Sequence, residues 1–205
     1  MKKLFLSSSF ADVYNLFPDF ANENPKGKSI TFIPTASILE EIKFYVEDDK
    51  KALKELGLKI DELEITNATS KEISDKLTNN DYIFVAGGNS FYLLQEMKKT
   101  GTDKIISRQI NDGKIYIGSS AGSVILSPNI EYIKKMDDCT KAQELTDYNA
   151  LSIVNFYPVP HYTNYPFEEI VEEIIKQYES KIKLIPITNS QVITVTEDEE
   201  KIESN

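Results

Sequence analysis

The chain is poor in several residue types, and each shortage removes a class of site. Among its 205 residues there is one cysteine, Cys139, so an intrachain disulfide and a metal cage built from cysteines are both excluded. This scarcity suits a reducing compartment, and we expect a cytoplasmic location. Arg108 is the only arginine, so a guanidinium that binds a carboxylate through two hydrogen bonds has a single candidate. His161 is the only histidine, and tryptophan is absent.

Long apolar runs and clustered positive charge are also missing. No segment is long and apolar enough to cross a bilayer, so we expect no membrane partner. The net charge of −10 and a pI near 4.7 argue against a nucleic-acid surface, because phosphate binding depends on clustered Lys and Arg. The opening, Met1 to Ser7, contains only three consecutive apolar residues, which predicts a first β-strand and not a signal peptide.

What the chain does contain is an alternation of short β-rich runs with helical patterns, which predicts one α/β domain over residues 1–205. Buried parallel strands are expected at Lys3–Ser7, Ser29–Pro34, Lys59–Ile65, Tyr82–Ala86, Lys114–Ile117 and Ile153–Val159. Helices are expected at Ile38–Leu56, Ser70–Leu77, Ser90–Thr100, Thr102–Asp112, after Ser120, and at Pro166–Glu179. A hairpin with its turn at Asn189 and Ser190 is expected next, and residues 197–205 are expected to fray.

The strand that ends near Ile117 runs into Gly118 to Gly122, which matches Gly-x-Ser-x-Gly. In that motif a strand turns sharply into a helix and lifts the central serine above the sheet. Ser120 is therefore the candidate nucleophile, and the N–H of Ala121 is a candidate donor to a developing oxyanion. A tight turn of small residues that serves packing alone would look the same, so the motif is weak by itself.

A serine hydroxyl needs a base, and His161 is the one imidazole that the chain offers. A second glycine turn, Gly87 to Asn89, follows another predicted strand. The N–H of Gly88 could be the second oxyanion donor, while Asn89 is expected to cap the helix after it. In a parallel sheet the carboxyl ends of the strands share one edge, so these turns are expected to meet there.

The third member of a triad must orient the imidazole, and the acids between the two motifs are its candidates: Glu131, Asp137, Asp138, Glu144 and Asp147. Each preserves the order Ser, acid, His. We favour Asp138, with Asp137 and Glu131 as alternatives, because spacing alone does not decide which carboxylate reaches His161.

Three motif segments together resemble the peptidase E family of serine peptidases, also called dipeptidase E or aspartyl dipeptidases. They are Gly87 to Leu94, Gly118 to Ser123, and Phe156 to Tyr162. The resemblance implies a flavodoxin-like, class I glutamine amidotransferase-like three-layer sandwich with a mostly parallel sheet. It also implies Ser120 as nucleophile, His161 as base and the N–H groups of Gly88 and Ala121 as oxyanion hole. The family's acid maps onto residues 136–138, and a glutamate in some relatives keeps Glu131 open.

One departure concerns substrate choice. Members of the family that cleave after an N-terminal aspartate are expected to hold its carboxylate with an arginine beyond the histidine, and this chain has none there. Lys176 or Lys181 could substitute as point charges, but the helix predicted between Phe167 and Ile175 is rich in glutamate. Aspartyl specificity is therefore doubtful.

These observations lead us to expect a serine-type peptidase that hydrolyses short peptides through an acyl-enzyme, with no metal or organic cofactor. The chain is expected to be a monomer or a homodimer whose partner is a short peptide substrate. The alternatives are an α/β-hydrolase-like esterase, which shares the serine turn, and a non-catalytic binding protein on the same fold.

Overall fold

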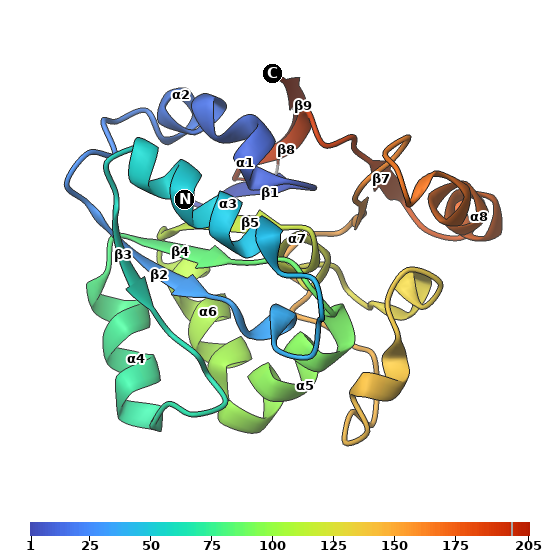
Figure 1. The fold of residues 1–205 in the computed structure, drawn as a ribbon, viewed down its shortest axis with the longest axis horizontal. Coiled ribbons are helices and arrows are strands. Elements are labelled where there is room, and N and C mark those ends of the chain that lie inside the picture. The colour runs from blue at the N-terminus through green and yellow to red at the C-terminus, as the bar shows by residue number, and fades with distance from the viewer. Residues whose placement is uncertain (198) are drawn as a thin grey trace.

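A seven-stranded sheet forms the middle of the molecule (Figure 1). The structure is a computed structural model that describes residues 1–197 and 199–205. The strand order is β3-β2-β4-β5-β1-β8-β9, and neighbouring strands from β3 to β1 are parallel, whereas β8 is antiparallel to β1 and β9 to β8. The strands are β1 (Lys3–Ser7), β2 (Ser29–Ile33), β3 (Lys59–Glu62), β4 (Tyr82–Val85), β5 (Ile115–Ser119), β8 (Gln191–Thr196) and β9 (Glu199–Ser204).

Helices cover both faces of this sheet, so the expected three-layer α/β architecture is confirmed (Figure 1). One face carries α1 (Phe10–Val13), α2 (Phe17–Ala21) and α3 (Phe44–Glu55), and the other carries α4 (Ser70–Asn79), α5 (Ser90–Thr100) and α6 (Thr102–Asn111).

The two faces of the sheet carry different side chains, because successive residues of a strand point to opposite faces. On β1, Phe5 joins an aromatic cluster under α1 to α3, whereas Leu4 and Leu6 point into an aliphatic core under α4 to α6. Phe84 on β4 stacks on Phe32 of β2 with ring centroids 5.0 Å apart. Successive residues of a strand point to opposite faces, so one apolar run supplies both cores.

The helices begin and end where local sequence signals allow. The side chain of Asn89 accepts a hydrogen bond from the N–H of Tyr92 at 2.9 Å and so caps α5, as expected. Gly101 ends α5 with a φ of 74°. The helix expected from Ile38 begins only at Phe44, because Thr35–Ser37 form a 3₁₀ turn and an irregular segment follows it.

The carboxyl-terminal part differs from the sequence expectation in its pairing. The expected run Ile153–Val159 yields only β6 (Tyr157–Val159), which pairs with β7 (Leu184–Pro186) in a separate two-stranded parallel sheet. β7 and β8 therefore do not form the expected hairpin, and β8 pairs instead with β1 and β9. Most of the segment expected to fray is strand β9; residue 198 lies outside the described residues.

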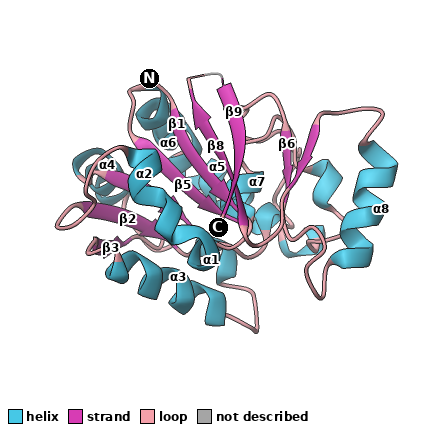
Figure 2. Cartoon of the chain, turned by 90° about the horizontal axis from the view of Figure 1, so that it is seen from above, coloured by secondary structure: helices cyan, strands magenta, loops and turns pink. Residues whose placement is uncertain are grey.

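A third apolar cluster lies beside the main sheet. It joins α8 (Glu168–Tyr178) and β6 to α5 and the short α7 (Ala121–Val124). Figure 2 shows α8 and β6 to one side of the central strands. This arrangement brings the segment after β6 next to the carboxyl end of β5. Among the described residues, no helix is both long and apolar enough to cross a membrane.

Candidate active site

Ser120 occupies a sharp turn between β5 and α7, with φ 49° and ψ −107°. Glycine flanks it for steric reasons. A Cβ on Gly118 would lie 2.7 Å from the carbonyl of Gly122, and one on Gly122 would lie 2.1 Å from the carbonyl oxygen of Val85. The N–H of Ser120 donates to the carbonyl of Ser7 at 2.9 Å. The backbone thus holds the serine in an unusual conformation at the edge where the parallel strands end.

His161 follows β6 by two residues and reaches this serine. Its Nε2 lies 3.1 Å from the Oγ of Ser120, and its ring stacks on Phe167 with centroids 4.8 Å apart. Burial lowers the pKa of His161, while Asn189 and, more weakly, Asp12 oppose that shift. The imidazole is therefore neutral near pH 7, as a base must be before it accepts a proton.

The other imidazole nitrogen contacts an amide. The Nδ1 of His161 lies 2.8 Å from the Oδ1 of Asn189, in the turn between β7 and β8. An acceptor at Nδ1 places the ring proton there and leaves the lone pair of Nε2 directed at Ser120. Asn189 is itself fixed, because its N–H donates to the Oδ1 of Asn164 at 2.8 Å.

The expected acids occupy other positions. The Oδ1 of Asp138 is exposed and accepts hydrogen bonds from the N–H and Oγ1 of Thr140 at 2.9 and 2.7 Å, which lower the Asp138 pKa. Asp137 accepts from the N–H of Ser90 at 2.8 Å. Glu131 is exposed and pairs with Lys134 at 2.9 Å.

We expected Asp138 to contact the imidazole of His161, and the structure does not place it there. The loop after α7 runs to the amino end of α5, where Asp137 accepts from an otherwise free N–H, and the Asp138 carboxylate accepts from Thr140 within the loop. In the described structure, the partner of His161 Nδ1 is Asn189 and not one of these carboxylates. The group at Nδ1 lies after the histidine in sequence and is an amide, so a search for acids between the two motifs misses it.

One proposed oxyanion donor, Ala121, follows Ser120 directly in the chain, and the other, Gly88, belongs to a glycine turn that borders this serine. A Cβ on Gly87 would lie 3.3 Å from the Cβ of Ser120, so the glycine turn after β4 abuts the nucleophile. Gly88 has φ 135°, and a Cβ there would lie 2.3 Å from the backbone of Ala36. Within the part of the chain that the structure describes, the N–H groups of Gly88 and Ala121 have no hydrogen-bond acceptor. Both remain available to a ligand oxygen.

The model of peptidase family S51 matches residues 4–203. The chain belongs to this family. It is a serine peptidase, and the resemblance to peptidase E on the three motif segments is confirmed.

Individual relatives agree with this assignment. An uncharacterized peptidase of Pasteurella multocida is 53% identical over 205 residues, which cover 100% of this chain and 99% of that protein. A crystal structure from Listeria monocytogenes, of a protein provisionally assigned as peptidase E, is 51% identical with a TM-score of 0.96 and covers 100% of this chain and 99% of that one. Peptidase E of a Nostoc species is 28% identical over 169 residues, or 80% of this chain and 66% of the relative.

Carboxylates lie near Tyr45, which borders the glycine turn of this S51 peptidase. The ring of Tyr45 borders Gly87, and the pKa of Tyr45 rises to about 12 because of burial and of nearby carboxylates, those of Glu40 and Asp137 among them. Lys141 pairs with Glu40 at 2.9 Å. Arg108 is exposed in the last turn of α6, just before the amino end of β5, whereas Ser120 follows its carboxyl end.

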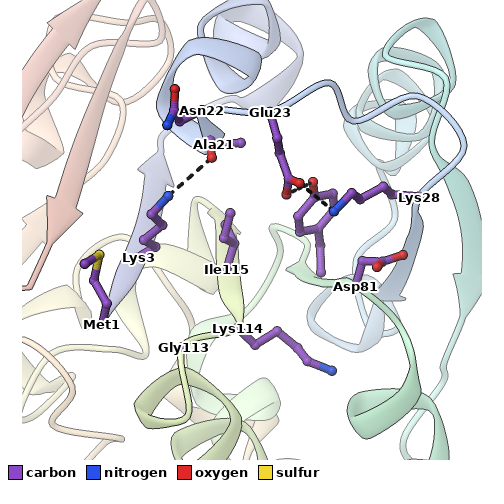
Figure 3. A pocket seen from close by; sticks show the side chains of 11 residues that line it. Met1, Lys3, Ala21, Asn22, Glu23, Lys28, Asp81, Gly113, Lys114 and Ile115 are labelled. Atoms are coloured by element: carbon purple, nitrogen blue, oxygen red, sulfur yellow. Dashed lines mark hydrogen bonds and ion pairs between the residues drawn. The ribbon is translucent and has the colours of Figure 1, made fainter.

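A cavity of about 420 Å³ lies at the opposite edge of the sheet from Ser120 (Figure 3). Its lining comes from the starts of β1, β4 and β5 and from the end of α2, and it includes Lys3, Lys28 and Lys114. The ammonium of Lys114 donates to three carbonyl oxygens, and that of Lys28 pairs with Glu23. Lys3 also donates to the carbonyl of Ala21, so all three lysines already have partners, and the cavity is separate from the peptidase site.

Proposed function

We propose that this chain hydrolyses short peptides through Ser120, His161 and Asn189. The observation that carries the proposal is the continuous line of contacts from Ser120 Oγ to His161 Nε2, at 3.1 Å, and from His161 Nδ1 to Asn189, at 2.8 Å. A nucleophile, a base and an orienting group in that order are what an activated serine requires.

The proposed cycle moves one proton at each step. His161 Nε2 takes the hydroxyl proton as Ser120 Oγ bonds to the scissile carbonyl carbon, and the N–H groups of Gly88 and Ala121 bind the resulting oxyanion. His161 then gives the proton to the leaving amine, the C–N bond breaks and an acyl-enzyme remains. Water, deprotonated by the same imidazole, releases the acid and restores Ser120. The cycle uses no metal or organic cofactor.

The proposed substrates are dipeptides or tripeptides whose first side chain is neutral and not aspartate. Support comes from the acidic surroundings of Tyr45 and from the missing arginine beyond His161. Lys176 is exposed on the glutamate-rich α8, and Lys181 lies 5.4 Å from the ring centroid of Tyr178. Carboxylates near Tyr45 would disfavour an aspartate side chain, because like charges repel. We further propose a cytoplasmic monomer or homodimer.

Labelling with a fluorophosphonate tests the activated serine. Intact mass should show one adduct on the native protein and none on Ser120→Ala, with much slower labelling of His161→Ala. Ser119→Ala is a neighbouring-serine control and should still be labelled. A folded native protein that neither reacts nor hydrolyses any peptide would contradict the proposal and favour the non-catalytic binding protein.

Substrate choice needs a separate comparison. Aspartyl dipeptides and matched dipeptides with a neutral first residue should be compared by kcat/KM, with p-nitrophenyl esters beside them. Faster cleavage of neutral dipeptides is expected. Faster cleavage of aspartyl dipeptides would overturn the proposed substrate class, and turnover of esters alone would support the esterase alternative.

A further inference from the structure

The segment that links β1 to α1 touches both proposed catalytic residues. At its start, the carbonyl of Ser7 accepts hydrogen bonds from the N–H of Ser120 at 2.9 Å and from the Oγ of Ser123 at 2.8 Å. Ser7 thus holds the backbone of the serine turn. The next residue, Ser8, points to the other side of the site.

Ser8 is only 2% exposed, and its hydroxyl makes two hydrogen bonds. Its Oγ accepts from the N–H of His161 at 3.0 Å and donates to the carbonyl of Ile187 at 3.0 Å. His161 has φ 64°, a left-handed conformation that costs free energy in a residue other than glycine. The Ser8 hydroxyl supplies the acceptor that this strained N–H needs.

The far end of the segment is fixed as well. The N–H of Phe10 donates to the Oγ of Ser119 at 3.3 Å, and that of Ala11 donates to the Oδ1 of Asp49 at 3.2 Å. Asp49 lies on α3 and is 2% exposed. Five residues, 7–11, are thereby held from several sides, so their position is well determined by the fold.

We propose that Ser8 is a positioning residue that sets the distance between Ser120 and His161. This inference rests on the proposed function of those two residues. Because Ser7 and Ser8 are consecutive in one fixed segment, the spacing between their contacts fixes the spacing between the serine turn and the histidine loop. Loss of the Ser8 hydroxyl frees the histidine backbone while leaving the nucleophile in place.

The test compares Ser8→Ala with the matched control Ser9→Ala, whose side chain makes no cap hydrogen bond. With the preferred dipeptide, Ser8→Ala should lose about 10²-fold in kcat with little change in KM, as expected for misplacement on the order of 1 Å. Ser9→Ala should match the native protein, and Ser8→Thr should recover part of the loss because it restores the hydroxyl.

A second measurement distinguishes a positioning role of Ser8 from a general loss of structure. His161 is the only histidine, so its imidazole gives one set of NMR signals, and its titration should shift in Ser8→Ala but not in Ser9→Ala. If Ser8→Ala fails to fold, Ser8→Cys keeps the side-chain volume with a poor acceptor and is judged by the same two readouts.

The outcomes distinguish the two proposals. A native protein that neither labels nor hydrolyses peptides contradicts the proposed function itself. An active native protein whose folded Ser8→Ala or Ser8→Cys variant keeps native kcat, or loses activity with an unchanged His161 titration, overturns the positioning role alone.

Discussion

Asn189 accepts a hydrogen bond from His161 at 2.8 Å across 28 positions of sequence, in the place where a triad carries a carboxylate. An amide oxygen orients the imidazole as a carboxylate does, but it carries no charge to stabilise the imidazolium. In the proposed site, Asn189 therefore orients the imidazole without stabilising its charged form, and substitutions at this position can test each effect.

Asn189→Ala should lower kcat by at least about tenfold, because the imidazole loses its orienting acceptor and general-base catalysis depends on it. Asn189→Asp should keep activity and raise the pKa of His161, since a carboxylate favours the charged ring. Steady-state kinetics and the NMR titration of His161 measure both effects. Asp138→Asn is the control and should have native kcat. A large loss of kcat in this variant would indicate that Asp138, and not Asn189, orients His161.

The dependence of kcat/KM on pH should report His161. Burial holds its pKa below 6.5, so activity should be lost as pH falls through that lower value and should be level at neutral pH. The midpoint of this loss is measured from kcat/KM against pH, with a dipeptide whose first residue is neutral. It is compared with the pKa of His161 from an NMR titration of Ser120→Ala. A midpoint clearly above 6.5 would be inconsistent with the buried, amide-paired imidazole.

Asp49 should make stability depend on pH. Burial raises its pKa to about 7, against hydrogen bonds from Ser119 and Ala11, while Asp48, Asp12 and Tyr45 are the nearby titratable groups. In the described structure its Oδ2 has no partner. The folded state therefore binds the proton more tightly than the unfolded state, and stability falls as pH rises from about 4 to about 7.

Asp49→Asn removes that dependence. At pH 8 its Tm should exceed the native value by at least about 2 °C, and the difference should vanish near pH 4. Thermal unfolding followed by circular dichroism measures this. Asp48→Asn, on the exposed side of α3, should leave the curve almost unchanged. A Tm that is lower in Asp49→Asn at both pH values would show that the carboxylate stabilises the fold.

Gly88→Ala should destabilise the protein and lower activity together. The new Cβ would lie 2.3 Å from the backbone of Ala36 at a φ of 135°, so the turn that presents the Gly88 N–H must shift. Gly101→Ala is the control, because its φ is 74° but nothing lies within 4 Å. It should cost only about 1–2 kcal/mol for the left-handed conformation and leave kcat near native.

Sequence patterns predicted the elements whose signals are local. Apolar runs predicted the first five strands of the chain. The glycines around Ser120 made that serine the candidate nucleophile, and His161 was the candidate base because the chain has no other imidazole. The pairing of strands was predicted less well, because an apolar run such as the one at β6 does not indicate which strand it will pair with. β8 follows β7 after a short turn, yet it pairs with β1, near the other end of the chain.

The missed site residues share one cause. The proposed roles of Asn189 and Ser8 each depend on a hydrogen bond to His161, which lies 28 positions from Asn189 and 153 from Ser8. Both are residue types common in turns. The only available signal was their position, since Ser8 follows β1 at the catalytic edge and Asn189 precedes β8, which lies beside β1. Sequence alone indicated a turn at Asn189 and, at Ser7 to Phe10, either a solvated turn or a segment that lines the site, but it did not indicate the contact of either residue with His161.

The position of β8 also gives the site an order of appearance during synthesis. Ser120 and His161 leave the ribosome before Asn189, and Val192, which pairs with Ser7, follows three residues later. A nascent chain that ends before residue 189 carries serine and imidazole, but it lacks the acceptor for Nδ1 and the strand that flanks β1. Premature termination after α8 would therefore leave the proposed site without Asn189, and that site can be assembled only after residue 189 has been synthesised.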